Sequence, residues 1–370
     1  MKELGRLTLE EKVGQLFFLG FQESAPDTDT QALIDRIRPG GFIFFQRNIE
    51  TLAQFYGLTT RLRETNGMPA LLGIEHEGGR VDRLKQLFGP LPPMSELAAQ
   101  GTAPLRSGAR IIAAELEAAG LNLALAPVLD LSHPDSFMAQ RTLSAEPAEA
   151  GRLGAAFIDE LARKGILSCV KHFPGQGSTA TDPHFGLPRI DRTKRQLLQE
   201  DALPFMDVLD EADIIMVSHA HFSGLGDEKP VPASLSPRVV DGFLRKKLGY
   251  TGVIMTDDMT MGAITSLGLT PHTFLAAFEA GNDMLHFSQT TPLVEQAFRL
   301  IVKSAKASEA LRTRLDESVT RILALKSKIQ YSPLRYRAHV RTRIQRQIEK
   351  LRATAELEHS PQAAERRHLP

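Results

Sequence analysis

The sequence is poor in cysteine, has no excess of charge of either sign and contains no long apolar run. Cys169 is the single cysteine in 370 residues, so no internal disulfide can form, which suits a reducing compartment. The 44 Lys and Arg residues balance the 44 Asp and Glu residues, so no overall field attracts nucleic acid. No apolar stretch approaches the roughly 20 residues that span a bilayer, and residues 1–6 lack the apolar core of a signal peptide. We therefore expect a cytoplasmic globular protein without a nucleic-acid or membrane partner.

Short apolar runs alternate with longer helical patterns, which is typical of βα units and a parallel sheet. Helical segments are predicted over residues 111–119, 148–164, 237–248 and 271–280, each followed by a glycine suited to a left-handed C-cap. Strands are predicted near residues 16–20, 41–45, 70–74, 121–127, 167–171, 214–218, 252–256 and 283–287. About eight such strands close a (β/α)8 TIM-type barrel, which is the fold that we expect. An open doubly wound sheet is the alternative, but the first βα turn lacks its Gly-x-Gly-x-x-Gly phosphate loop.

Polar side chains follow the apolar runs at several of the predicted strand ends. In a barrel of this type the C-terminal ends of the strands form one rim, and that rim carries the active site. Residues far apart in the sequence would therefore converge on one site: Glu75, Asp130, Lys171, His172, Ser218, His219 and Asp257.

The loop after the fifth predicted strand contains the most informative segment. Lys171 and His172 open it, and Asp182 and His184 lie one residue apart around Pro183. A carboxylate that holds an imidazole in one tautomer is the usual way to build a general acid/base on a histidine. An Asp-x-His pair is common, however, and by itself indicates catalysis only weakly.

Two other features have simpler structural interpretations. His219 and His221 form a His-x-His pair, but no Cys or acidic partner lies at ligand spacing, so we favour a rim histidine and a loop histidine over a metal site. Cys169 lies within an apolar strand run, which favours a small core residue over a nucleophile. No metal and no cofactor are expected.

Residues 335–370 differ in composition from the rest of the chain. Nine Lys and Arg against four Glu give this segment a net charge of +5. Val340, Ile344, Ile348 and Leu351 recur at helical spacing, which predicts one amphipathic helix followed by a disordered end. Packing of this helix against the barrel or a partner subunit is favoured over nucleic-acid binding.

The segment from Lys171 to His184 closely resembles the signature of glycoside hydrolase family 3, in its bacterial β-N-acetylglucosaminidase branch. The resemblance covers roughly residues 8–330 in the order of the family. Four further blocks carry it: residues 73–84, 216–219, 252–261 and 280–284. The resemblance implies a catalytic barrel over residues 1–333 and a basic helical or disordered extension over residues 334–370.

The same resemblance implies the roles of individual residues. Asp257 would be the nucleophile, His184 the general acid/base and Asp182 its orienting partner. Glu75, Arg83, Arg141, Lys171 and His172 would hydrogen-bond the terminal sugar. The pattern of residues does not by itself choose between Asp257 and its neighbour Asp258. The family match selects Asp257 and leaves Asp258 to cap a loop.

Four positions depart from the family pattern. Glu75 replaces an Asp, His76 a Gln, Gln176 a His and Pro183 a Ser. None of these changes removes the dyad or the nucleophile, so they bear on which sugar and leaving group the protein accepts.

The resemblance implies a retaining exo-β-N-acetylglucosaminidase that removes terminal GlcNAc from peptidoglycan-derived muropeptides, without a cofactor. Its expected partner is therefore a small carbohydrate, and the sequence leaves the oligomeric state open. Two alternatives remain. A β-glycoside phosphorylase of the same family would pass the glycosyl group to phosphate, which a histidine, unlike a carboxylate, would not repel. A non-catalytic sugar-binding protein would show no turnover.

Overall fold

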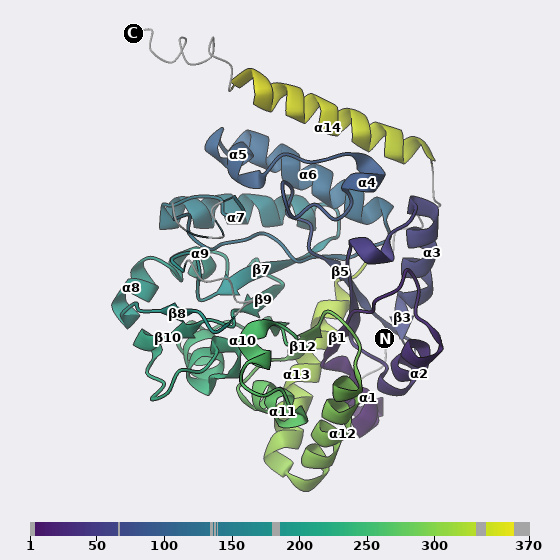
Figure 1. The fold of residues 1–370 in the computed structure, drawn as a ribbon, viewed down its shortest axis with the longest axis vertical. Helices are drawn as coiled ribbons and strands as arrows, with labels where there is room; N and C mark the ends of the chain where they lie inside the picture. The colour runs from purple at the N-terminus through teal and green to yellow at the C-terminus, as the bar shows by residue number, and fades with distance from the viewer. Residues whose placement is uncertain are drawn as a thin grey trace.

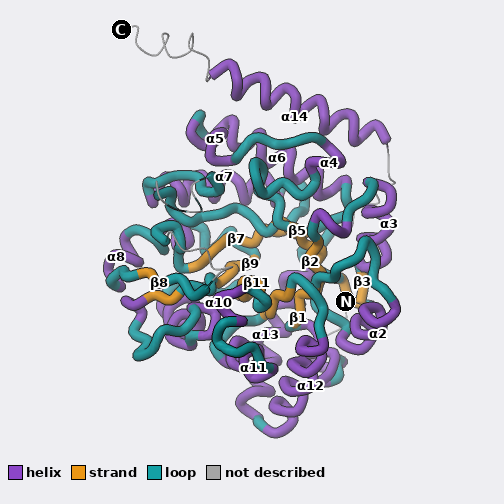
Figure 2. The backbone as a smooth tube through the Cα atoms, viewed as in Figure 1, coloured by secondary structure: helices purple, strands orange, loops and turns teal. Residues whose placement is uncertain are grey.

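A closed barrel of eight parallel strands forms the centre of the computed structural model, confirming the predicted fold (Figures 1 and 2). The structure describes residues 4–65, 67–133, 136, 138, 140–179, 186–330 and 338–358. The strands are β1 (Phe17–Leu19), β2 (Gly41–Phe44), β5 (Leu71–Ile74), β6 (Leu123–Ala124), β7 (Leu167–Phe173), β9 (Ile214–Val217), β11 (Val253–Asp258) and β12 (Met284–Phe287). They are hydrogen-bonded in the order β1-β12-β11-β9-β7-β6-β5-β2.

Helices surround the barrel on its outer side (Figure 1). They are α1 (Leu9–Gln15), α2 (Thr28–Ile37), α3 (Leu52–Leu62), α4 (Lys85–Phe88), α5 (Met94–Ala99), α6 (Thr102–Ala118), α7 (Pro147–Ala162), α8 (Lys194–Gln199), α9 (Leu203–Met206), η5 (Arg238–Lys247), α10 (Gly262–Thr265), α11 (Pro271–Glu279), α12 (Pro292–Ala307), α13 (Glu309–Ser327) and α14 (Ala338–Glu358). Two short ribbons, β3 (Glu64–Thr65) with β4 (Met68–Pro69) and β8 (Arg189–Ile190) with β10 (His221–Phe222), lie outside the barrel.

The alternation of side chains along each strand divides the core into two layers. Phe17 points outward, where its ring stacks on Phe287 and meets Phe298 of α12 edge-on. Phe18 points inward, where its ring lies edge-on to His286, its partner on the neighbouring strand β12. A Cβ at Gly73 would lie 2.7 Å from the Phe18 ring, so only glycine leaves room for that ring.

Helix α14 is the last described element, and it lies across α4 and α6 on the outside of the barrel (Figure 1). Its buried stripe comprises Ile344, Ile348 and Leu351, three of the four residues whose spacing predicted the helix. The guanidinium Nε of Arg341 also donates to the carbonyl oxygen of Leu87 at 2.7 Å. Helix α14 thus covers helices α4 and α6, which follow the β5 loop in the chain.

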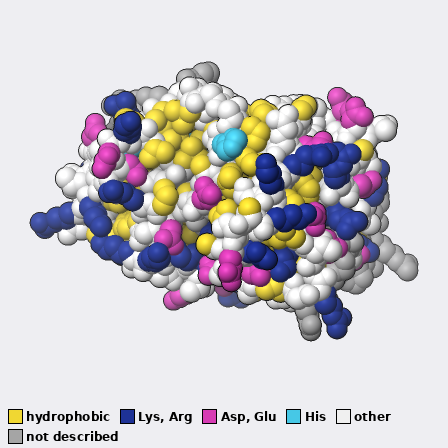
Figure 3. Space-filling model, turned by 90° about the horizontal axis from the view of Figure 1, so that it is seen from below, with side chains coloured by type: hydrophobic (Ala, Val, Ile, Leu, Met, Phe, Trp, Pro, Cys, Tyr) yellow, Lys and Arg dark blue, Asp and Glu magenta, His cyan; other side chains and the backbone are white. Residues whose placement is uncertain are grey.

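The lower face of the molecule shows how the balanced charge is distributed. Basic and acidic side chains are interspersed there, with apolar side chains between them (Figure 3). This face therefore presents no field of a single sign.

Candidate active site

The C-terminal ends of the barrel strands bring the predicted rim residues together. Glu75 follows β5, Lys171 and His172 lie in the last half of β7, and Asp257 is the penultimate residue of β11. Arg83 and Arg141 come from the loops after β5 and β6 and reach the same rim through ion pairs. The described part of the sequence-predicted site is therefore assembled in one place.

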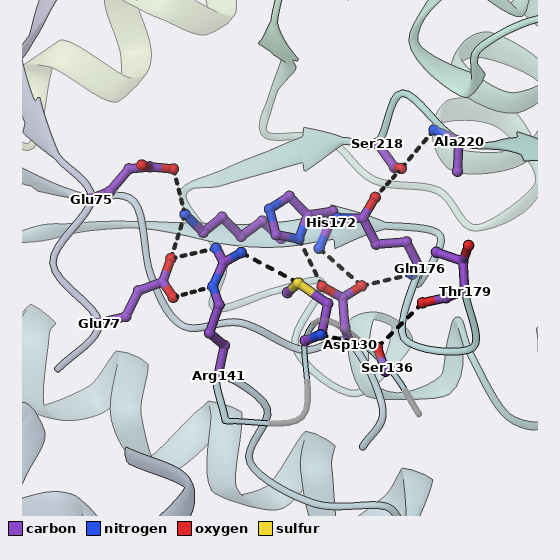
Figure 4. A network of polar contacts seen from close by, with 12 residues as sticks. Glu75, Glu77, Asp130, Ser136, Arg141, His172, Gln176, Thr179, Ser218 and Ala220 are labelled. Carbon is purple, nitrogen blue, oxygen red and sulfur yellow. Dashed lines mark hydrogen bonds and ion pairs between the residues drawn. The ribbon is translucent and has the colours of Figure 1, made fainter. Parts of the chain in front are cut away.

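Lys171 lies between two carboxylates on this rim. Its fully buried Nζ is 3.0 Å from Oε1 of Glu75 and 2.7 Å from Oε1 of Glu77. Nε and Nη2 of Arg141 bind the two oxygens of Glu77 at 2.7 and 2.8 Å (Figure 4). Arg83 completes the cluster, because its Nη2 lies 3.1 Å from Oε2 of Glu75.

The two glutamates remain ionised, although Glu77 is buried and Glu75 is partly buried. Burial raises the pKa of Glu75, but Lys171 and Arg83 lower it more, and the net pKa lies well below its usual value. For Glu77 the same balance, with Arg141 and Lys171 as the cations, leaves a pKa of about 2. Both carboxylates can therefore accept hydrogen bonds from sugar hydroxyls, and the cations can donate them.

Glu77 is the main addition to the predicted substrate-binding set. It belongs to the Glu-Gly-Gly part of the family block, in which the resemblance implies a role only for Glu75 and Arg83. Its double contact with Arg141 and its contact with Lys171 make it the centre of the cluster.

A tight turn explains why Glu75 and Arg83 meet. Gly78 and Gly79 both have positive φ, 76° and 58°, and a Cβ at Gly78 would lie 2.6 Å from the carbonyl oxygen of Pro92. The N–H of Glu77 donates to the oxygen of Val81 at 2.8 Å, which closes the turn. The chain therefore reverses direction and returns Arg83 to the strand end that carries Glu75.

Asp130 orients His172 on the next part of the rim. Its Oδ2 is 2.7 Å from Nδ1 of His172, and its Oδ1 accepts the N–H of Gln176 at 2.7 Å (Figure 4). An acceptor at Nδ1 places the proton there and leaves Nε2 of His172 for other contacts. Oε1 of Gln176 in turn accepts the hydroxyl proton of Ser218 at 2.7 Å, so the residue that departs from the family's His closes this network.

Asp257 is 6 % exposed, and a backbone N–H binds one of its two carboxylate oxygens. Its Oδ1 accepts the N–H of Asp258 at 2.8 Å. Burial raises the pKa of Asp257, but the nearby His172, His219 and His286 and that backbone N–H lower it more, so the net pKa lies below its usual value. An ionised carboxylate at a strand end is what a glycosidase nucleophile requires.

Asp258 is engaged differently. Its Oδ1 accepts the N–H groups of Thr260 and Ser288, both at 3.0 Å, and it also binds the Thr260 hydroxyl. These contacts cap the loop after β11 and link it to the end of β12. The carboxylate of Asp258 is thus occupied by the protein, in contrast to that of Asp257.

Two further histidines, His219 and His286, lie near Asp257. His219 is bound at both nitrogens, by Ser234 Oγ at 2.7 Å and by the Asp258 carbonyl oxygen at 2.9 Å. His286 is buried beside Phe18, and neither of its nitrogens has a hydrogen-bond partner among the described residues. Within this same set, no three His, Cys, Asp or Glu side chains form a group suited to a metal ion.

Asp182 and His184, the predicted acid/base dyad, lie outside the described residues. Cys169 is fully buried, and burial raises the pKa of its thiol to about 12, which makes it an inert core residue. Among the described helices, none has both the length and the apolar character needed to cross a membrane.

Comparison with known proteins gives a consistent result. Residues 8–325 match the model of the glycosyl hydrolase family 3 N terminal domain. A protein named beta-hexosaminidase from Tolumonas auensis is 34% identical over 264 residues, which cover 70% of this chain and 78% of the relative. A similarly named protein from Idiomarina loihiensis is also 34% identical, over 66% of this chain and 75% of its own.

Solved structures of a β-N-acetylglucosaminidase and a β-N-acetylhexosaminidase have a similar fold. A glycoside hydrolase family 3 β-N-acetylglucosaminidase from Paenibacillus superposes with a TM-score of 0.86 at 32% identity, over 93% of this chain and 68% of the other. A β-N-acetylhexosaminidase from Beutenbergia cavernae gives a TM-score of 0.79 at 26% identity, over 87% of this chain and 99% of the other.

Proposed function

The chain belongs to glycosyl hydrolase family 3, and we propose that it is a retaining exo-β-N-acetylhexosaminidase that removes terminal β-linked GlcNAc. The observation that carries this proposal is the ionised, backbone-anchored Asp257 on a rim that also holds paired cations and carboxylates. The names of the relatives, beta-hexosaminidase and β-N-acetylglucosaminidase, support the choice of sugar.

In the first half-reaction, Asp257 attacks the anomeric carbon while the glycosidic bond breaks. A carboxylate oxygen of Asp257 forms a bond to that carbon, and His184 gives its proton to the departing oxygen. In the second half-reaction, His184 takes a proton from water, the water oxygen attacks the same carbon, and the bond to Asp257 breaks. Two inversions give net retention.

The Glu75, Glu77, Lys171, Arg83 and Arg141 cluster would bind the hydroxyls of the terminal ring. A sugar hydroxyl both donates and accepts, and this cluster offers carboxylate acceptors beside ammonium and guanidinium donors. Charge-assisted hydrogen bonds are stronger than neutral ones, so they hold the ring firmly over Asp257.

Within the same proposal, the natural substrate would be a GlcNAc-containing fragment of peptidoglycan, and the protein would act in the cytoplasm. A cytoplasmic location is compatible with a sequence that has one cysteine, fully buried and inert.

The first experiment measures turnover of an aryl β-GlcNAc glycoside by the wild type and by Asp257→Ala. We expect the variant to fold normally and to lose turnover, because the group that bonds to the anomeric carbon is gone. Asp316→Asn, which alters an exposed carboxylate paired with Lys12, serves as the matched control and should keep full activity. A mechanism-based fluoro-sugar should label Asp257, whereas labelling at Asp258 would refute the assignment.

The dyad is tested by leaving-group dependence and by a double mutant. His184→Ala and Asp182→Ala should each slow hydrolysis, and the double variant should be barely slower than His184→Ala, because residues that act as one unit are non-additive. An activated aryl leaving group should partly restore the first half-reaction of His184→Ala. Multiplicative losses would contradict the dyad. Release of sugar phosphate when phosphate is added would identify a phosphorylase instead.

A further inference from the structure

His76 is a fully buried histidine between the β5 loop and helix α6. Its Nε2 lies 2.7 Å from Oε2 of Glu115, a buried glutamate of α6. Its Nδ1 accepts the backbone N–H of Arg83 at 3.2 Å. The imidazole therefore links the outer helix to the backbone of a residue that would bind the sugar.

These two contacts fix the tautomer of the ring. The N–H of Arg83 can only donate, so Nδ1 must be the unprotonated nitrogen. The ring proton then lies on Nε2, where it is donated to the Glu115 carboxylate. A neutral His76 with this tautomer satisfies both partners at once.

Asp82 offers Nδ1 a competing partner. Its Oδ1 lies 3.5 Å from Nδ1 and has no hydrogen-bond partner among the described residues, while its Oδ2 accepts the N–H of Leu91. If Nδ1 gained a proton, it would pair with this carboxylate and could no longer accept from Arg83. Protonation thus exchanges a contact with Arg83 for a contact with Asp82.

We propose that neutral His76 is the positioning residue of Arg83, and that a proton on its Nδ1 releases the Arg83 backbone and weakens sugar binding. This inference rests on the proposed function, because it assigns Arg83 to the sugar. The side chain of Arg83 bridges to Glu75 at 3.1 Å, so a shift of its backbone reaches the carboxylate of the sugar-binding cluster.

The charges around the ring set the direction of the pH response. Burial lowers the pKa of His76 and Arg83 adds to this, but Glu115 and Asp82 raise it more, so the net pKa lies above its usual value. Burial in turn raises the pKa of Glu115 to about 6. The neutral form that holds Arg83 is therefore the alkaline form, and the positioning should fail as the pH falls.

Two substitutions separate positioning from titration. In His76→Gln, the amide oxygen can accept from Arg83 and the amide nitrogen can donate to Glu115, but the side chain does not titrate. In His76→Leu, both contacts are lost. His272→Gln, at an exposed histidine of α11, is the matched control.

We expect His76→Leu to lower kcat/KM for an aryl β-GlcNAc about 10- to 100-fold, mainly through KM, as misplacement of a binding group does. Adding this change to Arg83→Ala should cause little further loss, because residues in one chain of contacts are coupled. Multiplicative losses would overturn the proposal.

The pH profile provides the test that remains valid if His76→Leu does not fold. His76→Gln should match the wild type at the alkaline plateau and keep its kcat/KM to lower pH, whereas His272→Gln should follow the wild type throughout. An acid limb unchanged in His76→Gln would overturn the proposal.

A spectroscopic measurement keeps the inference separate from the proposed function. In 15N-histidine-labelled protein, the ring signals that disappear in His76→Gln should report a neutral ring with the proton on Nε2 at alkaline pH. If no β-GlcNAc glycoside is hydrolysed, the proposed function fails while this tautomer is still observed. A proton on Nδ1 at alkaline pH would refute the positioning role whatever the substrate.

Discussion

Glu75→Asp is the substitution that best tests the proposed sugar-binding role of the cluster around Lys171, because it restores the residue of the family pattern. Both oxygens of Glu75 are engaged, Oε1 with Lys171 at 3.0 Å and Oε2 with Arg83 at 3.1 Å. Removing one methylene withdraws the carboxylate by about 1.5 Å, the length of a C–C bond. Neither contact can then be kept at hydrogen-bond distance without movement of the backbone.

The consequences for the two cations differ. Lys171 keeps Glu77 at 2.7 Å and stays paired, whereas Arg83 loses its ion pair with Glu75. Loss of hydrogen bonds to charged groups of this kind lowers the free energy of unfolding by about 1.5–3 kcal/mol. If Arg83 binds the sugar as proposed, its misplacement by about 1 Å should lower kcat/KM on the order of 100-fold.

The assay compares kcat/KM of the wild type and Glu75→Asp on aryl β-GlcNAc, β-GalNAc and β-glucoside. We expect a similar loss on all three sugars, because the change disturbs a cluster that serves the common hydroxyls. Glu295→Asp is the control, since Glu295 also contacts two arginines, Arg36 and Arg299, but at the surface, where such pairs contribute little. Improved turnover of β-GlcNAc by Glu75→Asp would refute this reasoning and identify Glu75 as a specificity change.

Three further predictions concern stability. Glu77→Gln should lower the free energy of unfolding in a denaturant titration by about 3–5 kcal/mol, because it leaves the nearly buried Arg141 without its carboxylate; a loss below 1 kcal/mol would contradict this. Burial lowers the pKa of Lys326 from 10.5 to about 7, so the unfolded chain binds one more proton between these values and stability should rise with pH there. Lys326→Met should remove that rise, and an unchanged pH dependence would argue against it. Deleting residues 334–370 should lower Tm, since α14 buries Ile344 and Ile348 on the barrel, yet leave turnover of a small aryl glycoside nearly unchanged.

The positions of the strands could be predicted because each lies in a short apolar run, and several of these runs are followed directly by a polar residue. The run predicted at residues 167–171 extends in the structure to Phe173, because Lys171 and His172 are buried within the strand rather than placed after it. The four glycines predicted as C-caps all have positive φ, as a left-handed cap requires: Gly120, Gly165, Gly249 and Gly281. Local signals of this kind depend on near neighbours along the chain.

The starts of helices and the contacts between residues far apart in the sequence were harder to predict. Helix α6 begins at Thr102, well before the predicted residue 111. Pro104 is accommodated in its first turn, because the backbone N–H groups there have no intrahelical partner to lose. His76 and Glu115 are 39 positions apart, and nothing local indicates their contact. A buried contact of this kind depends on how α6 packs against the β5 loop, which no periodicity encodes.

The proposed binding of sugar hydroxyls by the cluster around Lys171 is compatible with the balanced charge of the chain. Its proposed substrate group is a neutral sugar, so no overall field is needed to attract it. What the hydroxyls need is donors and acceptors side by side, and the paired cations and carboxylates of the rim supply both. The carboxylates of Glu75 and Glu77 also balance the charge of Lys171, which lets this side chain remain fully buried and charged. The same side chains thus combine burial, charge balance and the proposed sugar recognition, so substitutions in this cluster should change stability and activity together.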